Sequence, residues 1–196
     1  MAIRLIAGLG NPGSEYDQTR HNAGAWFVQQ LAVRHQGLWR SDTKCYGMTA
    51  KINVKGEAIL LLQPTTFMNR SGQSVAAAAQ FYKIEPADIL VAHDELDLAP
   101  GTARFKLDGG HGGHNGLRDI IPALGNRRDF MRLRVGIGHP GNAKAVSSYV
   151  LGKPDQTDKH AIDAAINEAL ATLSLVFSGD MIKAMTQLHS FTAAHQ

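Results

Sequence analysis

Apolar and polar residues follow one another along this chain in blocks that predict strands and helices in alternation. Short apolar runs bounded by glycine or polar residues indicate buried strands, and apolar positions three or four residues apart indicate helices. The expected strands are Ile3–Ala7, Tyr46–Val54, Glu57–Leu62, Ile89–Ala92, Thr102–Leu107 and Arg132–Gly138. The expected helices are Asn22–His35, Ser71–Tyr82 with Ser71 as its N-cap, Leu117–Leu124, Asp158–Phe177 and Met181–Leu188.

This order of elements predicts an α/β fold. Two of the strands are separated only by Lys55 and Gly56, which favours an antiparallel hairpin. The other strands are separated by helices or long connections, which favours parallel pairing. We therefore expect a mixed, mostly parallel twisted sheet with helices on both faces. No repeat or linker interrupts the pattern, so residues 1–196 are expected to form a single domain.

Composition excludes several classes of protein. Hydrophobic residues make up 44% of the chain and charged residues 19%, as in ordinary globular proteins. The apolar runs are too short to cross a bilayer, and the sequence reaches Gly10 and Gly13 before a signal-peptide core could form. The single cysteine, Cys45, excludes an internal disulfide and a multi-cysteine zinc site. We expect a cytoplasmic protein without membrane contact, monomeric and without an obligate protein partner.

Positive charge is concentrated in one part of the chain. The net charge is only +3, but residues 104–134 contain seven Lys or Arg and three Asp. Arg104 and Lys106 share one face of an expected strand, and Arg132 and Arg134 share one face of another. If these strands pair, the four cations form a patch that can bind phosphate groups. A merely soluble surface is the alternative interpretation.

Polar residues concentrate in three segments that follow expected strands, a common position for active sites. These segments are Asn11–Gly24, His93–Asp97 and Gly109–Gly116. His21 and Asp94 lie at the ends of strands that can be neighbours, so the imidazole can act as a base that the carboxylate orients. The amides of three loop residues can donate to a carbonyl or an oxyanion, although closing turns is their ordinary role. They are Asn11, Asn69 and Asn115.

Other kinds of chemistry fit the sequence less well. Gly8–Gly13 matches the dinucleotide-binding pattern G-x-G-x-x-G, but no helix is expected to begin directly after it. A nucleophile elbow is absent and Cys45 has no neighbouring base, which favours an activated water over covalent catalysis. His111, His114 and His139 suggest a metal site only weakly, because glycines separate the first two. We expect no metal.

Taken together, the motifs resemble those of the bacterial peptidyl-tRNA hydrolase family. The resemblance extends from residue 3 to about residue 154 and fades in the C-terminal helices. Six motifs in the same order are more specific than any one of them. They are Gly8–Gly13, Tyr16 with Thr19–Gly24, Pro64–Asn69, His93–Asp97, Gly109–Gly116 and Arg134–Pro140.

The resemblance implies an enzyme that binds peptidyl-tRNA and hydrolyses the ester between the peptide and the 3′-terminal ribose, without a metal or cofactor. It implies that His21 is the general base, that Asp94 orients it and that Asn11 contacts the peptide. Further roles implied by the resemblance are substrate binding by Asn69 and Asn115, a tRNA-end site at Tyr16 and Phe67, a cleft shaped by Met68 and His114, and a 5′-phosphate clamp at Lys106 and Arg134. A non-catalytic RNA-binding module of the same fold is the alternative.

Overall fold

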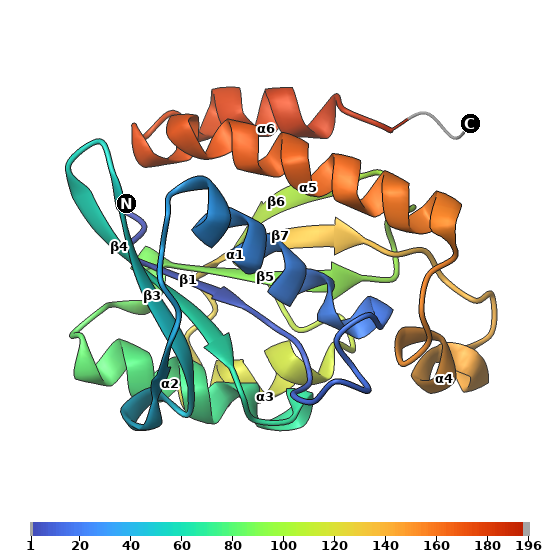
Figure 1. The fold of residues 1–196 in the computed structure, drawn as a ribbon, viewed down its shortest axis with the longest axis horizontal. Helices are drawn as coiled ribbons and strands as arrows, with labels where there is room; N and C mark the ends of the chain where they lie inside the picture. The colour runs from blue at the N-terminus through green and yellow to red at the C-terminus, as the bar shows by residue number, and fades with distance from the viewer. Residues whose placement is uncertain (1, 194–196) are drawn as a thin grey trace.

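Seven strands form one mixed sheet in the order β2-β3-β4-β1-β5-β7-β6 (Figure 1). The computed structural model describes residues 2–193. The strands are β1 (Leu5–Gly8), β2 (Arg40–Asp42), β3 (Gly47–Val54), β4 (Glu57–Pro64), β5 (Ile89–Glu95), β6 (Ala103–Leu107) and β7 (Met131–Gly136). The four central strands, β4, β1, β5 and β7, run parallel, and the outer pairings are antiparallel. The predicted fold class is therefore confirmed.

The predicted hairpin is present between β3 and β4. Its turn residues Lys55 and Gly56 have φ values of 52° and 84°, which a two-residue hairpin turn of the primed type requires. Glycine adopts this conformation without steric cost, which explains its place in the turn.

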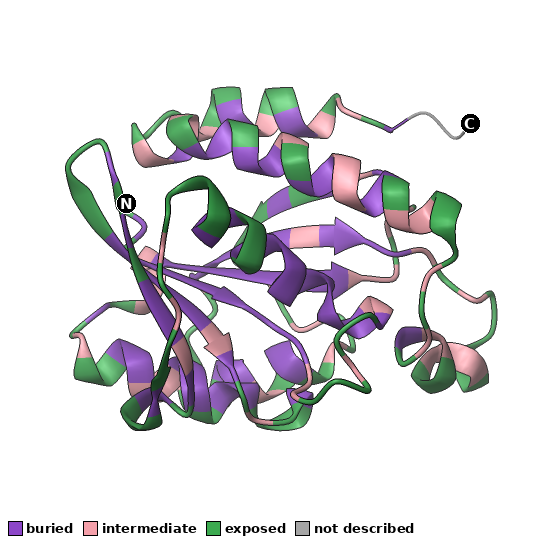
Figure 2. Cartoon of the chain, in the orientation of Figure 1, coloured by how far each residue is buried: buried purple, intermediate pink, exposed green. Residues whose placement is uncertain are grey.

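Helices cover both faces of the sheet, as predicted. They are α1 (Ala23–Arg34), α2 (Ser71–Phe81), α3 (Asn115–Ala123), α4 (Val146–Val150), α5 (Gln156–Phe177) and α6 (Met181–His189). Helices α1, α5 and α6 lie on one face and α2 and α3 on the other, while α4 lies beyond the ends of the parallel strands (Figure 1). Figure 2 shows α5 buried along the side that faces the sheet and exposed on the other. Each face therefore contributes its own apolar layer to the core.

Two glycines bring α1 unusually close to the sheet. A Cβ at Gly8 would lie 2.4 Å from the Gly24 carbonyl oxygen, and one at Gly24 would lie 2.2 Å from that of Ala92. Both distances are far below van der Waals contact, so only glycine fits at either position. The close packing places the N-terminus of α1, and the polar segment before it, against the end of β5.

Four details differ from the prediction. Arg70 is the N-cap residue of α2, whereas Ser71 is already helical and donates its hydroxyl to the Met68 carbonyl at 2.7 Å. Strand β5 continues to Glu95, so His93 and Asp94 belong to the strand rather than to the loop after it. Strand β2 and helix α4 were not predicted, because three and five residues show no usable periodicity.

Within residues 2–193, no helix combines the length and apolarity needed to span a bilayer.

Candidate active site

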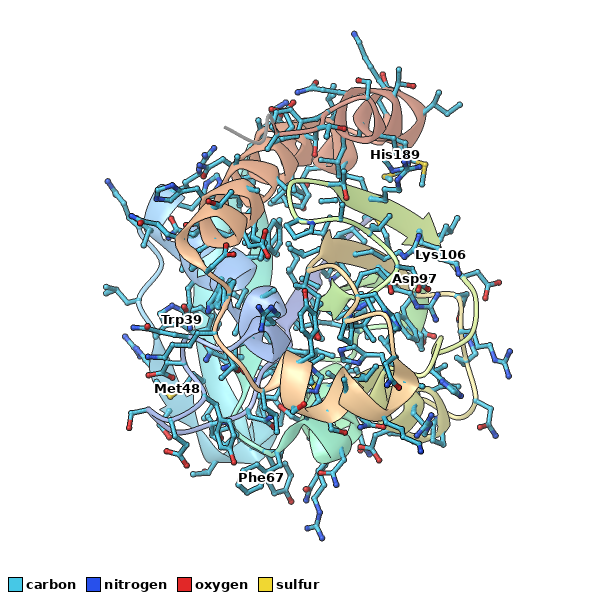
Figure 3. All side chains as sticks on the ribbon, turned by 90° about the vertical axis from the view of Figure 1, so that its right-hand side faces the viewer. Trp39, Met48, Phe67, Asp97, Lys106 and His189 are labelled. Carbon is cyan, nitrogen blue, oxygen red and sulfur yellow. The ribbon has the colours of Figure 1, made fainter. Side chains whose placement is uncertain are left out.

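The predicted polar segments meet at the carboxyl ends of the parallel strands. Ligands of open α/β sheets usually bind at this edge. The arrowheads of β5 and β7 point to the right in Figure 1, and Figure 3 looks at the molecule from that side. The segment after β1 contributes His21, β5 contributes Asp94, and the loop before α3 contributes His114.

His21 and Asp94 form a buried hydrogen-bonded pair, as the sequence suggested. Asp94 is 4% exposed and His21 is 8% exposed. The Nδ1 atom of His21 lies 2.8 Å from Oδ2 of Asp94. The carboxylate can only accept, so Nδ1 carries the proton and Nε2 is the basic nitrogen. In the described part of the chain, Nε2 of His21 makes no hydrogen bond.

The second carboxylate oxygen of Asp94 forms a hydrogen bond with His114. Oδ1 lies 2.7 Å from Nε2 of His114. Nδ1 of this ring accepts the backbone N–H groups of Gly116 and Leu117 and so caps α3. These two roles fix the tautomer, with the proton on Nε2 donated to Asp94. Asp94 therefore accepts from two histidines, of which only His21 retains an available basic nitrogen.

Burial and charge act in opposite directions on these groups. Burial alone lowers the pKa of His21, but the charge of Asp94 and its hydrogen bond outweigh it and raise the pKa above 6.5. Burial alone raises the pKa of Asp94, but the two histidines lower it well below its usual range. Asp94 is therefore ionised at neutral pH, and His21 is a stronger base than a free imidazole.

A third histidine, His93, lies behind this pair and is neutral. Burial, followed by the nearby His114, lowers the pKa of His93 to about 4. Its Nδ1 donates to the Asp94 carbonyl oxygen at 2.8 Å, and its ring centroid lies 5.0 Å from that of His114. No role for His93 was predicted from the sequence, although its place beside Asp94 was a signal. It adds no positive charge that would compete with His21 for Asp94.

Amide groups lie in a cavity of about 190 Å³ on one side of His21. Oδ1 of Asn11 accepts the Met68 N–H at 2.7 Å, and Oδ1 of Asn115 accepts from Arg118 at 3.1 Å. The NH₂ group of each side chain makes no hydrogen bond within residues 2–193, so it can donate to a ligand. The residues that line the cavity are Asn11, His21, Phe67, Met68, Asn69, Asn115, Ser147, Val150 and Leu151. The structure thus brings the three predicted asparagines to one cavity with His21.

A second cavity, of about 330 Å³, also borders His21, and its lining includes three cations and three carboxylates. Strands β6 and β7 pair as expected, with Arg104 opposite Arg134 and Lys106 opposite Arg132. Lys106, Arg132 and Arg134 line this cavity, whereas Arg104 does not. Arg134 is not free of partners, because its Nε donates to Oε1 of Glu95 at 2.8 Å. In Figure 3, Lys106 and Asp97 lie together on one side of the view and Phe67 lies at its lower edge.

Tyr16, like Arg104 of the predicted cationic patch, lines neither cavity. Its ring packs edge-on against Phe67, with the centroids 6.3 Å apart, so it supports the exposed Phe67 ring from behind.

The sequence did not reveal the role of α4, two of whose residues, Ser147 and Val150, line both cavities. Arg20 connects this helix to the segment that carries His21. Its Nη1 donates to the Tyr149 carbonyl at 2.9 Å, and its guanidinium lies 4.0 Å from the centre of the Tyr149 ring. The only sequence signal was the position of Arg20 beside His21.

Other chemistries can be tested against the same geometry. Ligand atoms of His21, Asp94 and His114 lie within 4.8 Å of one another, which is the one such group in residues 2–193. These side chains already bond to one another, and His114 also caps α3, so a metal ion would have to displace those bonds. His139 is not part of this group. Burial raises the pKa of the Cys45 thiol to about 11, which leaves no thiolate for nucleophilic attack.

A histidine with an available basic nitrogen therefore lies at the edge of two cavities, one of which contains three cations. The model of the peptidyl-tRNA hydrolase family matches residues 5–196. The peptidyl-tRNA hydrolase of Pectobacterium atrosepticum is 56% identical over 193 residues, which cover 98% of this chain and 99% of that protein. That of Pseudomonas putida strain F1 is 60% identical over 189 residues, or 96% and 97% of the two chains.

A solved structure agrees with both sequence comparisons. The crystal structure of peptidyl-tRNA hydrolase from Acinetobacter baumannii superimposes with a TM-score of 0.95 at 51% identity, covering 98% of this chain and 97% of that one. The chain belongs to the peptidyl-tRNA hydrolase family, as its motifs indicated.

Proposed function

We propose that this chain, a member of the peptidyl-tRNA hydrolase family, cleaves the ester between a peptide and the 3′-terminal ribose of tRNA with His21 as general base. The observation that carries the proposal is the buried 2.8 Å hydrogen bond between His21 and Asp94. It leaves Nε2 of His21 without a protein partner at the junction of the two cavities. A water molecule bound there can give its proton to Nε2 as its oxygen attacks the ester carbonyl carbon.

The proton moves twice in this reaction. In the first step His21 becomes an imidazolium, which the negative charge of Asp94 stabilises. As the tetrahedral intermediate collapses, the bond to the ribose oxygen breaks and that oxygen takes the proton from His21. The products are a peptide carboxylate and a tRNA with a free terminal hydroxyl, and the base is regenerated without a covalent intermediate.

The asparagine amides bind the groups around the ester. Asn11 and Asn115 each present an NH₂ group to the cavity, because their oxygens are already bonded. Such donors can hold the peptide backbone or stabilise the oxyanion, and Asn69 adds a third amide at the same cavity. Backbone contacts suit a substrate whose peptide varies in sequence. Recognition of the peptide carbonyl by Asn11 explains a preference for blocked over free aminoacyl-tRNA.

The RNA occupies the surface around these cavities. The exposed ring of Phe67, supported by Tyr16, offers a stacking surface for a terminal base, and Met68 and His114 shape the cleft beneath it. Lys106 and Arg134 bind the 5′-phosphate of the acceptor stem in the second cavity. We propose that residues 1–196 act as one catalytic domain, as a monomer in the cytoplasm.

The experiment compares N-acetyl-aminoacyl-tRNA with unblocked aminoacyl-tRNA, each labelled on the amino acid, with a chelator present. We expect release of label from the blocked substrate only. Binding of tRNA is measured in parallel. Retained binding with no release from either substrate would contradict the proposal and leave the alternative function, that of a non-catalytic RNA-binding module.

A further inference from the structure

A buried guanidinium beside the second cavity lacks most of its hydrogen-bond partners. Arg132 is 1% exposed, and its planar group lies 4.2 Å from the centre of the Phe130 ring. Its Nη2 donates to the Gly109 carbonyl oxygen at 2.6 Å. Its Nε and Nη1 are also shielded from solvent, but they have no partner among residues 2–193. Unpaired donors of a buried cation are costly, so a native protein rarely keeps them without a role.

The charge of Arg132 is not neutralised by the protein either. Burial lowers the pKa of Arg132 to about 10, so the group remains a cation at neutral pH. No carboxylate of the described chain lies within ion-pair distance of it. Asp108 is the nearby acid, but its Oδ1 accepts the N–H of Gly109 at 2.6 Å. Arg134, by contrast, is paired with Glu95. The deepest cation of the cavity therefore has no paired carboxylate in the described part of the chain.

A second cation, Lys106, lies close to the Arg132 guanidinium. It lies directly opposite Arg132 in the β6–β7 pairing. A Cβ at Gly109 would lie 3.1 Å from Nζ of Lys106 and 3.7 Å from Nη1 of Arg132, so both nitrogens flank the Gly109 backbone. Both side chains line the 330 Å³ cavity. An anion placed between them could accept hydrogen bonds from an ammonium and a guanidinium together.

We propose that Arg132 is a third ligand for the terminal phosphate of the RNA, bound together with Lys106, and lies deeper in the cavity than Arg134. This inference rests on the proposed binding of that phosphate in the second cavity. A Cβ added at Gly110, Gly112 or Gly113 would meet no atom within 4 Å, so there is open space beside the loop that carries Gly109. The phosphate oxygens then accept from Nε and Nη1, which have no other acceptor.

The test is the preference for a 5′-phosphate. KM is measured for N-acetyl-aminoacyl-tRNA with its 5′-phosphate and after removal of that phosphate, for wild type, Arg132→Gln and Arg128→Gln. The preference is the KM of the dephosphorylated substrate divided by the KM of the phosphorylated one. Loss of one charged hydrogen-bonding group should reduce this ratio about 10-fold or more in Arg132→Gln. Arg128 is exposed, is close enough to influence Arg132 and lies outside the cavity, so its variant should keep the preference.

Two outcomes would overturn the inference. An unchanged KM ratio in Arg132→Gln, with both substrates weakened alike, would reduce Arg132 to a structural support of Gly109 and Phe130. An equal loss of preference in Arg128→Gln would mean that only the net charge of this region matters. Partial recovery of the preference in Arg132→Lys, which keeps the charge, is expected of a phosphate ligand.

A measurement on the wild-type protein covers the case in which Arg132→Gln does not fold. The side-chain Nε–H signals of ¹⁵N-arginine are followed as inorganic phosphate is added, and the Arg132 signal is assigned from the Arg132→Lys spectrum. A saturable shift of that signal is expected, and no shift at phosphate concentrations that displace bound tRNA would overturn the inference. This titration is independent of ester cleavage, so it separates failure of the inference from failure of the proposed function.

Discussion

At the scale of single residues, the direction of each hydrogen bond at Asp94 decides what the histidines can do. Asp94 accepts from Nδ1 of His21 and from Nε2 of His114, and the latter ring is fixed by its cap on α3. An aspartate is required because only a carboxylate accepts at both oxygens. An asparagine would place an NH₂ group against one of two N–H donors.

Asp94→Asn should therefore lower kcat by about 10²–10⁴, because it removes both the charge that stabilises the imidazolium and one of the two acceptors. Asp97→Asn is the matched control, since Asp97 is an exposed acid that lines the second cavity without contact to either histidine. The two variants are compared by kcat on a blocked aminoacyl-tRNA and by their melting temperatures. Equal, small effects of both substitutions on kcat would contradict the role given to Asp94.

The pH dependence follows from the raised pKa of His21. His21 must be neutral to accept a proton, so activity should rise as pH rises through its folded-state pKa. We expect the acidic limb of kcat/KM to have its midpoint above pH 6.5, and Asp94→Asn to move the midpoint downward. A pH–rate profile of both proteins checks this. A wild-type midpoint at or below 6.5 would show that burial outweighs the effect of Asp94.

The same pKa shift has an effect on stability. Because the folded pKa of His21 is raised, its protonation stabilises the fold most fully below pH 6.5. This contribution is lost as pH rises through the folded pKa. With His21 as the general base, we therefore expect the highest activity at pH values where this stabilising charge is absent.

The sequence indicated the residues of the site better than their contacts. The pairing of His21 with Asp94 could be expected because one follows β1 and the other lies at the carboxyl end of the neighbouring parallel strand β5. The contact of His114 with Asp94 could not, because it depends on how a glycine-rich loop folds. Nor could the pairing of Glu95 with Arg134, since it depends on the order of strands β5 and β7 in the sheet.

At the scale of elements, the close contact of α1 with the sheet positions the catalytic segment. Gly8→Ala should destabilise the protein by about 3 kcal/mol, because its Cβ would lie 2.4 Å from the Gly24 carbonyl oxygen and 2.5 Å from Val28. Gly110→Ala is the matched control, since nothing lies within 4 Å of a Cβ there. Thermal or urea unfolding measures both. A Gly8→Ala variant as stable as Gly110→Ala would contradict the packing argument.

Element boundaries were predictable where periodicity was strong. Helix α5, expected over Asp158–Phe177, is observed over Gln156–Phe177, and its earlier start reflects the Asp155 side chain, which caps it. Helix α4 escaped prediction because its place is set by distant contacts rather than by its own sequence. Arg20 donates a hydrogen bond to the Tyr149 carbonyl oxygen of this helix, and the Tyr149 hydroxyl donates to the Ile137 carbonyl oxygen at 2.6 Å.

At the scale of the whole molecule, the net charge is nearly balanced, while charged side chains of both signs gather in the second cavity. The net charge is +3, yet three cations line one cavity. Such focusing favours attraction of an RNA end to one place over binding along the whole surface.

Arg134→Ala should mainly raise KM and reduce the salt dependence of binding by about one unit in slope, because one phosphate contact is lost. The substitution also leaves the Glu95 carboxylate unpaired in the cavity. The double variant with Glu95→Gln removes that repulsion, and the change in slope should persist in it. KM measured over a range of salt concentrations tests this, and an unchanged slope in both variants would rule out a phosphate contact at Arg134.

His21 is the proposed general base of the ester hydrolysis. The most direct measurement is the single-turnover rate of hydrolysis of N-acetyl-aminoacyl-tRNA by His21→Ala at saturating enzyme, with His35→Ala, an exposed histidine at the end of α1, as control. We predict a rate about 10²–10⁴ times lower for His21→Ala, with unchanged tRNA binding and folding, and a wild-type rate for the control. A His21→Ala rate close to that of wild type would contradict the role of His21 as general base.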